Sequence, residues 1–192
     1  MLLLILGLII FLGVHSVRIV AEGWRAAQIA KHGPKKWKGL YTMASIVGIV
    51  LIAYGYGLAR QAPVVLYTPP VALRHLGSLL TVPAFVLIAA AYVPGTRIKR
   101  AVGHPMVLGV KVWAFAHLLA NGALADLVLF GSFLVWAIFD YRAARERDRI
   151  AEKVYVAGPG SRDSIAVVIG LVAWAVFALW LHQPLIGAQP FS

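Results

Sequence analysis

The chain has 192 residues, of which 61% are hydrophobic and 13% charged, and its mean hydropathy is +0.83. This composition is typical of an integral membrane protein in contact with a lipid bilayer and excludes an ordinary soluble domain. On so apolar a chain, the formal net charge of +11 indicates loops that face anionic lipid rather than a nucleic-acid surface. The absence of cysteine excludes disulfides, thiolate metal sites, iron–sulfur clusters and covalent haem attachment.

Six segments of roughly 20 apolar residues are long enough to cross a bilayer as helices. In chain order they are 1–21, 40–59, 71–93, 105–121, 122–140 and 164–182, the fourth and fifth being joined by a tight turn at Asn121-Gly122. The first has no basic residue before Arg18 and no small-residue cleavage site, which favours a retained span over a signal peptide. The predicted fold class is all-α, an integral membrane bundle of six transmembrane helices in a single domain over residues 1–192.

Basic residues concentrate in three connections, 22–39, 94–104 and 141–163, which hold 14 of the 18 lysines and arginines. Because positively charged loops stay on the cytoplasmic side, these connections are predicted to be cytoplasmic and both termini non-cytoplasmic. An even number of spans is consistent with this orientation.

Three shorter patterns predict local structure. The stretch DYRAARERDRIAEK alternates charge at helical spacing, which predicts a short solvated extension of the fifth helix. His32 in KHGPKKWK is predicted to be a loop residue, and the YGYG run at 54–57 predicts close helix packing through Gly55 rather than an ion filter.

Ionisable residues inside the spans are the candidate functional residues, because burying such a group in lipid is costly. His15 lies in LGVHSVRIVAEGW, and His117 lies in HPMVLGVKVWAFAHLLANG together with Lys111 and Asn121. One buried histidine is explained equally well by an interhelical hydrogen bond. Two in separate spans of a cysteine-free chain favour haem ligation, because neutral imidazole is a good axial ligand and a bundle interior is a natural haem site.

The depth of these histidines leaves their pairing open. His117 lies roughly 18 Å from the cytoplasmic end of its helix at about 1.5 Å of rise per residue, whereas His15 is nearer the cytoplasmic end of its own. By depth alone His15 would pair with His104, and His117 with His75 or His182. Periodicity does not decide among these pairings.

The stretches HPMVLGVKVWAFAHLLANG and ALADLVLFGSFLVWAIFD, with the ending LHQPLIGAQPF, resemble the NnrU family of membrane proteins, which includes the plant zeta-carotene isomerases. The resemblance covers nearly the whole chain and implies a multi-pass protein of the bacterial inner membrane. Bacterial members are implied to accompany nitrite and nitric oxide reduction in denitrification. The isomerase branch is implied to hold haem b and to isomerise a cis double bond of a polyene.

The haem ligands of that branch are a histidine in an N-terminal His-Ser pair and the histidine closing a W-x-x-x-H motif, which implies His15 and His117 as iron ligands here. A cysteine three residues before the motif histidine is replaced by Ala114, so a mechanism that needs thiolate exchange is not carried over.

The other polar residues near the two histidines have alternative roles. Arg18, one turn from His15, either pairs with a haem propionate or lies at the membrane interface. Asn121 is predicted to cap the helix end beside His117. Lys111 is predicted to snorkel to the cytoplasmic interface, or else to meet a propionate or substrate, and Asp140 is a candidate partner for it.

Three functional hypotheses follow. The first is a haem b protein that supports denitrification by electron transfer, sensing or reductase assembly, with nitrite or nitric oxide reductase components as partners. The second is a haem-dependent cis–trans isomerase of a lipid-soluble polyene such as a carotenoid, and the third is a haem-free scaffold whose histidines only join helices. Ala114 and the bacterial-type ending favour the first. No soluble catalytic signature is present, so no catalytic residue is predicted.

Overall fold

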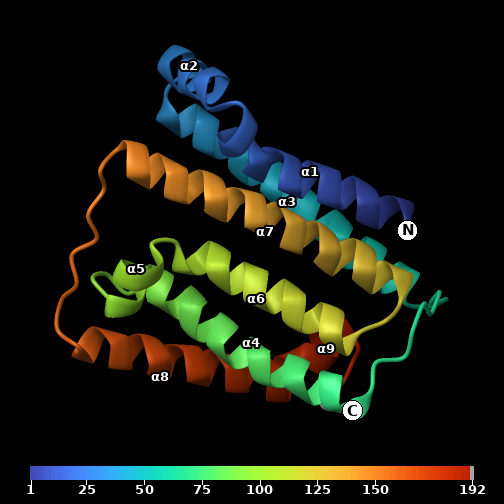
Figure 1. The fold of residues 1–192 in the computed structure, drawn as a ribbon. Helices are drawn as coiled ribbons and strands as arrows, with labels where there is room; N and C mark the ends of the chain where they lie inside the picture. Colours follow the sequence, from blue (N-terminus) through green and yellow to red (C-terminus); the bar gives the residue numbers. More distant parts are fainter. Residues whose placement is uncertain (191–192) are drawn as a thin grey trace. The chain divides into compact units, whose positions relative to one another are not determined.

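The computed structural model describes residues 1–190 and is helical throughout its regular structure, which confirms the all-α prediction (Figure 1). Val65 and Ala123 form an isolated antiparallel β-bridge, outside any strand. Phe191, at the end of the quoted C-terminal stretch, lies outside the described residues. The elements in chain order are α1 (Leu2–Val20), α2 (Glu22–His32), α3 (Pro34–Ala59), α4 (Val71–Tyr92), α5 (Arg97–Val102), α6 (Pro105–Ala120), α7 (Leu124–Ile150), α8 (Ser161–Val176), the π-helical η1 (Phe177–Leu181) and α9 (His182–Ile186).

The chain folds as two compact units, Met1–Val64 and Val65–Ser192. In the first unit α1 packs along α3, and glycines allow the two backbones to approach closely. A Cβ atom at Gly7 would lie 2.6 Å from the backbone nitrogen of Ile52, and one at Gly55 would overlap the backbone of Leu4. The predicted packing role of Gly55 is therefore confirmed, since only a residue without a side chain fits this contact.

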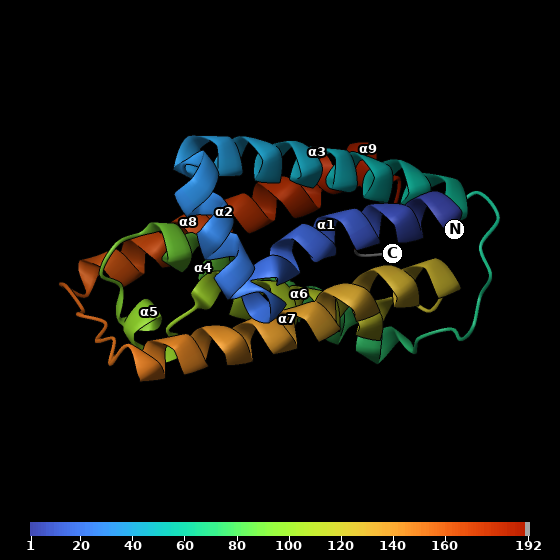
Figure 2. The same ribbon diagram turned by 90° about the horizontal axis from the view of Figure 1, so that it is seen from above.

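In the second unit α4 packs against both α6 and α8, and α6 also packs against α7 (Figures 1 and 2). Glycines again lie where the helices touch. A Cβ atom at Gly77 would lie 2.6 Å from the Ala116 carbonyl oxygen on α6, and one at Gly170 would lie 2.6 Å from the Cα of Val86. Small residues at such contacts are typical of helices that associate in lipid, where close packing replaces the hydrophobic effect.

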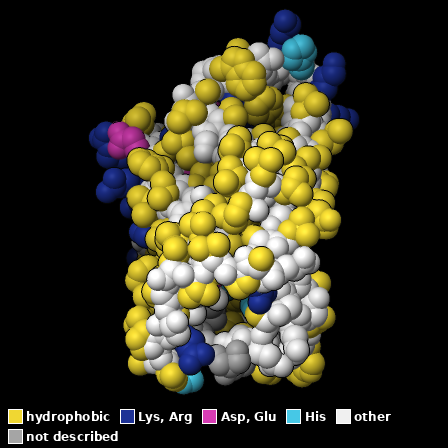
Figure 3. Space-filling model, turned by 90° about the vertical axis from the view of Figure 1, so that its right-hand side faces the viewer, with side chains coloured by type: hydrophobic (Ala, Val, Ile, Leu, Met, Phe, Trp, Pro, Cys, Tyr) yellow, Lys and Arg dark blue, Asp and Glu magenta, His cyan; other side chains and the backbone are white. Residues whose placement is uncertain are grey.

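Five helices are long and apolar enough to span a membrane: Leu2–Val20, Pro34–Ala59, Val71–Tyr92, Leu124–Ile150 and the continuous segment Ser161–Ile186. The fourth predicted span, α6, has 16 residues, which gives about 24 Å of helix against roughly 30 Å of hydrocarbon core. Large hydrophobic side chains are exposed along the sides of the long helices, among them Ile9, Val50 and Val168, as expected of helices that meet acyl chains. Hydrophobic side chains also lie among polar and backbone atoms on the face drawn in Figure 3. The length and apolar composition of these helices are therefore those of a membrane protein.

His32 was predicted to be a loop residue, and that prediction is wrong. The connection 22–39 contains α2 and the first turns of α3, and His32 is the last residue of α2. Gly33, with a φ of 81°, separates the two helices, and Pro34 occupies the first turn of α3, where a missing N–H costs nothing. The predicted helical extension after the fifth span is confirmed, because α7 continues to Ile150.

Candidate functional site

His117 lies in the last turn of α6, half-buried among aromatic side chains. Its ring stacks on Phe130 of α7 with centroids 4.5 Å apart, and Trp113 lies 5.0 Å away. The Nδ1 atom is 2.8 Å from the Trp113 carbonyl oxygen. Because a carbonyl only accepts, this contact puts the proton on Nδ1 and makes Nε2 the nitrogen with the lone pair in the neutral ring.

Hydrogen bonds from the Asn121 and Tyr67 side chains and from the backbone close the end of α6 beside His117. The Asn121 side chain donates to the His117 carbonyl oxygen at 2.9 Å, so Asn121 caps the helix as predicted. The Tyr67 hydroxyl, from the segment before α4, donates to the carbonyl oxygens of Leu118 and Asn121. Gly122 accepts from the backbone nitrogens of Leu66 and Tyr67. The Tyr67 contacts supply donors to carbonyls at a helix end, where the last carbonyls lack intrahelical partners.

His15 lies in α1 of the first unit and has the same local arrangement. Its Nδ1 is 2.6 Å from the Phe11 carbonyl oxygen, one turn earlier in the helix. Its ring stacks on Phe11 at 4.2 Å and lies 5.1 Å from the ring of Tyr41 on α3. The carbonyl contact therefore selects the same tautomer at His15 as at His117.

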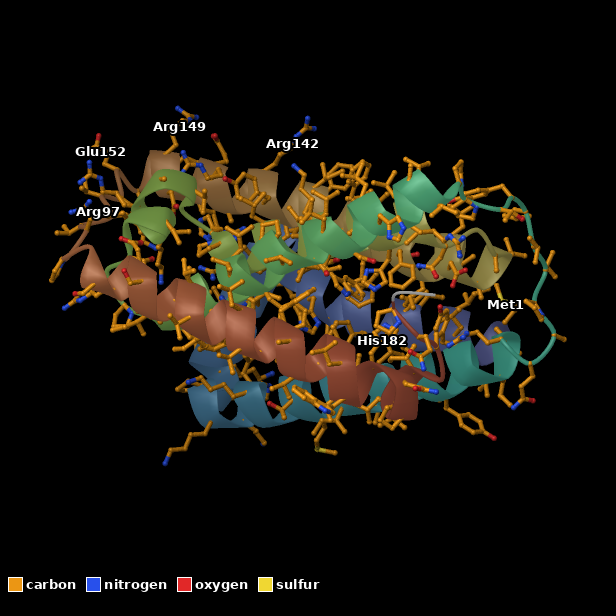
Figure 4. All side chains as sticks on the ribbon, turned by 90° about the horizontal axis from the view of Figure 1, so that it is seen from below. Met1, Arg97, Arg142, Arg149, Glu152 and His182 are labelled. Atoms are coloured by element: carbon orange, nitrogen blue, oxygen red, sulfur yellow. The ribbon has the colours of Figure 1, made fainter. Side chains whose placement is uncertain are left out.

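The other histidines of the depth argument differ in their surroundings. His75 is exposed on α4. His182 begins α9 in the second unit, with Nδ1 2.8 Å from the Ala188 carbonyl oxygen (Figure 4). His104 precedes α6 and contacts Asp148.

The two long cations singled out in the sequence have protein partners. Arg18 Nε lies 3.9 Å from a carboxylate oxygen of Glu22, at the exposed end of α1. The Lys111 ammonium lies 5.8 Å from the centre of the Tyr141 ring, a distance at which a cation–π contact is favourable. Asp140, the candidate partner of Lys111, instead lies 4.0 Å from Arg147.

A second polar cluster joins the start of α6 to the end of α7 and the segment that follows it. Asp148 Oδ2 accepts from His104 Nε2 at 2.8 Å and from the Tyr155 hydroxyl at 2.8 Å, while Lys153 lies 3.7 Å from Oδ1. Burial raises the pKa of the Tyr155 phenol, and its hydrogen bond to Asp148 raises it further. Tyr155 therefore remains a donor at neutral pH, and the cluster fastens the α7–α8 connection to α6.

The surroundings of His15 in the first unit and of His117 in the second each fit the chemistry of an axial haem ligand. Each imidazole donates one ring N–H to a backbone carbonyl, the second contact that metal-bound histidines almost always make. Aromatic side chains, including Trp113, Phe130 and Phe133 at His117, provide the apolar surroundings that a porphyrin requires. Within residues 1–190 no three His, Asp or Glu side chains converge as a metal site, whereas axial ligation of haem needs only two imidazoles.

The two tyrosines of these clusters, Tyr67 and Tyr155, were not predicted from the sequence. Tyr67 caps α6 from 54 positions before Asn121, and Tyr155 reaches Asp148 from the following connection. Neither tyrosine lies in a span or in a recognisable motif, so the sequence carries no local signal for either contact.

Nearly the whole chain is similar to one protein family. Residues 3–190 match a family model described as NnrU protein. No curated protein and no solved structure matched the chain.

Proposed function

Because the chain belongs to the NnrU family, we propose that it is a haem b-binding membrane protein that supports denitrification, through electron transfer, sensing or assembly of a nitrite or nitric oxide reductase. His15 and His117 are the axial ligands in this proposal. Reductase components are its proposed protein partners, and the bacterial inner membrane is its proposed location.

The observation that carries the haem proposal is the matched hydrogen bonding of the two histidines. Nδ1 of His15 contacts the Phe11 carbonyl at 2.6 Å, and Nδ1 of His117 contacts the Trp113 carbonyl at 2.8 Å. Both contacts run to the residue one turn earlier, so both rings are oriented by their own helices. An imidazole oriented in this way presents Nε2 as the ligand atom and gains basicity from the carbonyl it donates to.

When bound, the haem would supply one-electron chemistry at an iron whose potential depends on its axial ligands and on the polarity around it. The chain's own contribution is to hold the rings and to limit water. Phe130 covers one face of the His117 ring, and Asn121 and Tyr67 hold the helix end that carries it. Arg18, although paired with Glu22, remains the proposed partner of a propionate because it is one turn from His15 at an exposed helix end.

The proposed membrane arrangement has six spanning helices, with both termini non-cytoplasmic, and counts α6 as a span in addition to the five longer helices. The shortness of α6 is compatible with this arrangement, because it packs between α4 and α7 and a short helix is accommodated by local thinning of the bilayer. The connections rich in arginine and lysine then lie on the cytoplasmic side.

A gene deletion complemented with variants tests the role. The deletion strain is expected to grow poorly on nitrite or to handle nitric oxide poorly, while its carotenoid isomer profile stays unchanged. Wild-type protein should restore growth, His75→Ala should restore it equally, and His117→Ala should not. Accumulation of a cis polyene in the deletion strain would replace this role with that of a polyene isomerase, and full rescue by His117→Ala would exclude a haem-dependent role.

A further inference from the structure

The short helix α5 is held rigidly at the end of α4, although it has only 6 residues. The buried Thr96 caps it, accepting from the Lys99 backbone nitrogen at 3.0 Å. Asp163 at the start of α8 accepts from the Ile98 backbone nitrogen at 3.1 Å, and Arg162 donates to the Pro94 carbonyl oxygen at 3.1 Å. Side chains on α5 therefore project from a fixed support rather than from a loose loop.

The outer face of α5 carries two exposed arginines. Arg97 and Arg100 are three residues apart and so share one face, whereas Ile98 and Val102 are half-buried on the opposite one. A third exposed arginine, Arg145 of α7, adjoins the last turn of α5: a Cβ atom at Gly103 would lie 2.7 Å from its Nη1. We name Arg97, Arg100 and Arg145 the arginine site.

The carboxylates at this end of the second unit are mostly engaged elsewhere. Asp148 is bound by His104, Tyr155 and Lys153, Asp163 by α5, and Glu146 by Arg149 at 2.6 Å. Glu152, also at the end where Arg97 lies, is exposed (Figure 4). Within residues 1–190 no ion pair involves a member of the arginine site, so no carboxylate contact offsets its positive charge.

Exposed apolar side chains adjoin the arginine site in the sequence. Tyr92, at the end of α4, is 74% exposed, and Met106, in the first turn of α6, is 37% exposed. Tyrosine at the end of a spanning helix is typical of the headgroup level of a membrane. Cations beside apolar surface at this level complement a molecule that has both a phosphate and acyl chains.

We propose that the arginine site binds the phosphate of an anionic phospholipid headgroup at the membrane surface. Guanidinium groups donate to phosphate oxygens in a bidentate fork, and a rigid support reduces the entropy lost on binding. The ligand is a lipid rather than free phosphate, because the site lies at the end of helices whose outer side chains are apolar. This inference is independent of the haem proposal.

Native mass spectrometry of the detergent-purified protein tests the site. Phosphatidylglycerol and phosphatidylcholine of equal chain length are titrated, and the bound species are counted. Wild type is expected to bind phosphatidylglycerol preferentially, and each arginine of the site changed to glutamine should weaken that binding about fivefold, from roughly 1 kcal/mol per basic residue at a membrane surface.

Matched variants distinguish a site from net charge. Arg97→Gln with Arg100→Gln is compared with Arg147→Gln with Arg149→Gln, which loses the same charge from arginines that already pair with Asp140 and Glu146. The first pair should lose the preference and the second should keep it. Arg97→Lys with Arg100→Lys should keep most of the binding. This result would show that the positions tolerate substitution, so that the loss in the glutamine pair does not come from misfolding. Equal losses in both glutamine pairs, or equal displacement of lipid by inorganic phosphate, would overturn the proposal.

Discussion

At the scale of single residues, the end of α6 shows how one side chain positions another. His117 lies in the last turn of that helix, and Tyr67 bonds two of its terminal carbonyl oxygens from a distant segment. Loss of this hydroxyl leaves carbonyls without a donor close to the proposed haem ligand. The geometry of His117 therefore depends on a residue outside its own helix.

Tyr67→Phe is expected to destabilise the protein by about 1 kcal/mol, the usual contribution of a hydrogen bond, with faster amide exchange over residues 117–121. Hydrogen exchange read by mass spectrometry measures both effects. Tyr92→Phe is the matched control, because Tyr92 is 74% exposed at a helix end. Unchanged exchange in Tyr67→Phe would contradict the capping role.

The Tyr155–Asp148 contact predicts a pH dependence. Since the pKa of folded Tyr155 is raised, the contact stabilises the fold fully below the unfolded tyrosine pKa of about 10. That stability is lost as pH rises from there through the higher folded value. The free energy of unfolding measured from pH 8 to 11 should fall less steeply for Tyr155→Phe than for wild type. Identical slopes would show that Tyr155 does not titrate in this contact.

His15 and His117 could be singled out from the sequence as candidates, because ionisable residues in apolar spans are rare. The capping contact of Asn121 could be predicted because this residue directly follows the helix. Their partners could be predicted less well. The His104–Asp148 contact joins residues 44 positions apart, and only the packing of α6 against α7 brings them together. The pairing of Asp140 with Arg147 rather than Lys111 likewise depends on side-chain directions that helical spacing alone does not specify.

At the scale of elements, apolar length predicted the positions of the long helices well, because the bilayer imposes that length. It did not predict α2 or α5, which lie in charged connections. There the local signals are Gly33 before Pro34 and the cap at Thr96, and these signals are short. The prediction of His32 as a loop residue was therefore wrong, whereas the predicted extension of α7 was correct, since its alternating charges follow helical spacing.

The α1–α3 contact offers a test at this scale. Gly55→Ala is expected to destabilise the first unit by about 1–3 kcal/mol, because the new methyl would overlap the backbone of Leu4. Gly57→Ala is the control on the same helix: nothing lies within 4 Å of its added Cβ, and the higher helix propensity of alanine should stabilise by up to about 1 kcal/mol. Thermal unfolding in detergent compares the two. Equal midpoints would contradict close packing at Gly55.

At the scale of the whole molecule, the membrane topology can be tested because the chain has no cysteine of its own. Single cysteines at Lys35, Lys99 and Arg147 are expected to be shielded from an impermeant thiol reagent in intact cells. Cysteines at Gln61 and Gln189 should react. The reverse pattern would overturn the orientation, and labelling of both groups would overturn the six-span arrangement.

The central proposal is that His15 and His117 ligate haem b, and the reduced-minus-oxidised absorption spectrum of the detergent-purified protein tests it most directly. Two imidazole ligands give a six-coordinate, low-spin iron with sharp optical bands. Wild type, His75→Ala, His104→Ala and His182→Ala are expected to show those bands. His15→Ala and His117→Ala should each lose them, leaving little haem or a five-coordinate form that binds carbon monoxide. A haem-free wild type, or bands that survive both His15→Ala and His117→Ala but vanish in His104→Ala or His75→Ala, would contradict the assignment.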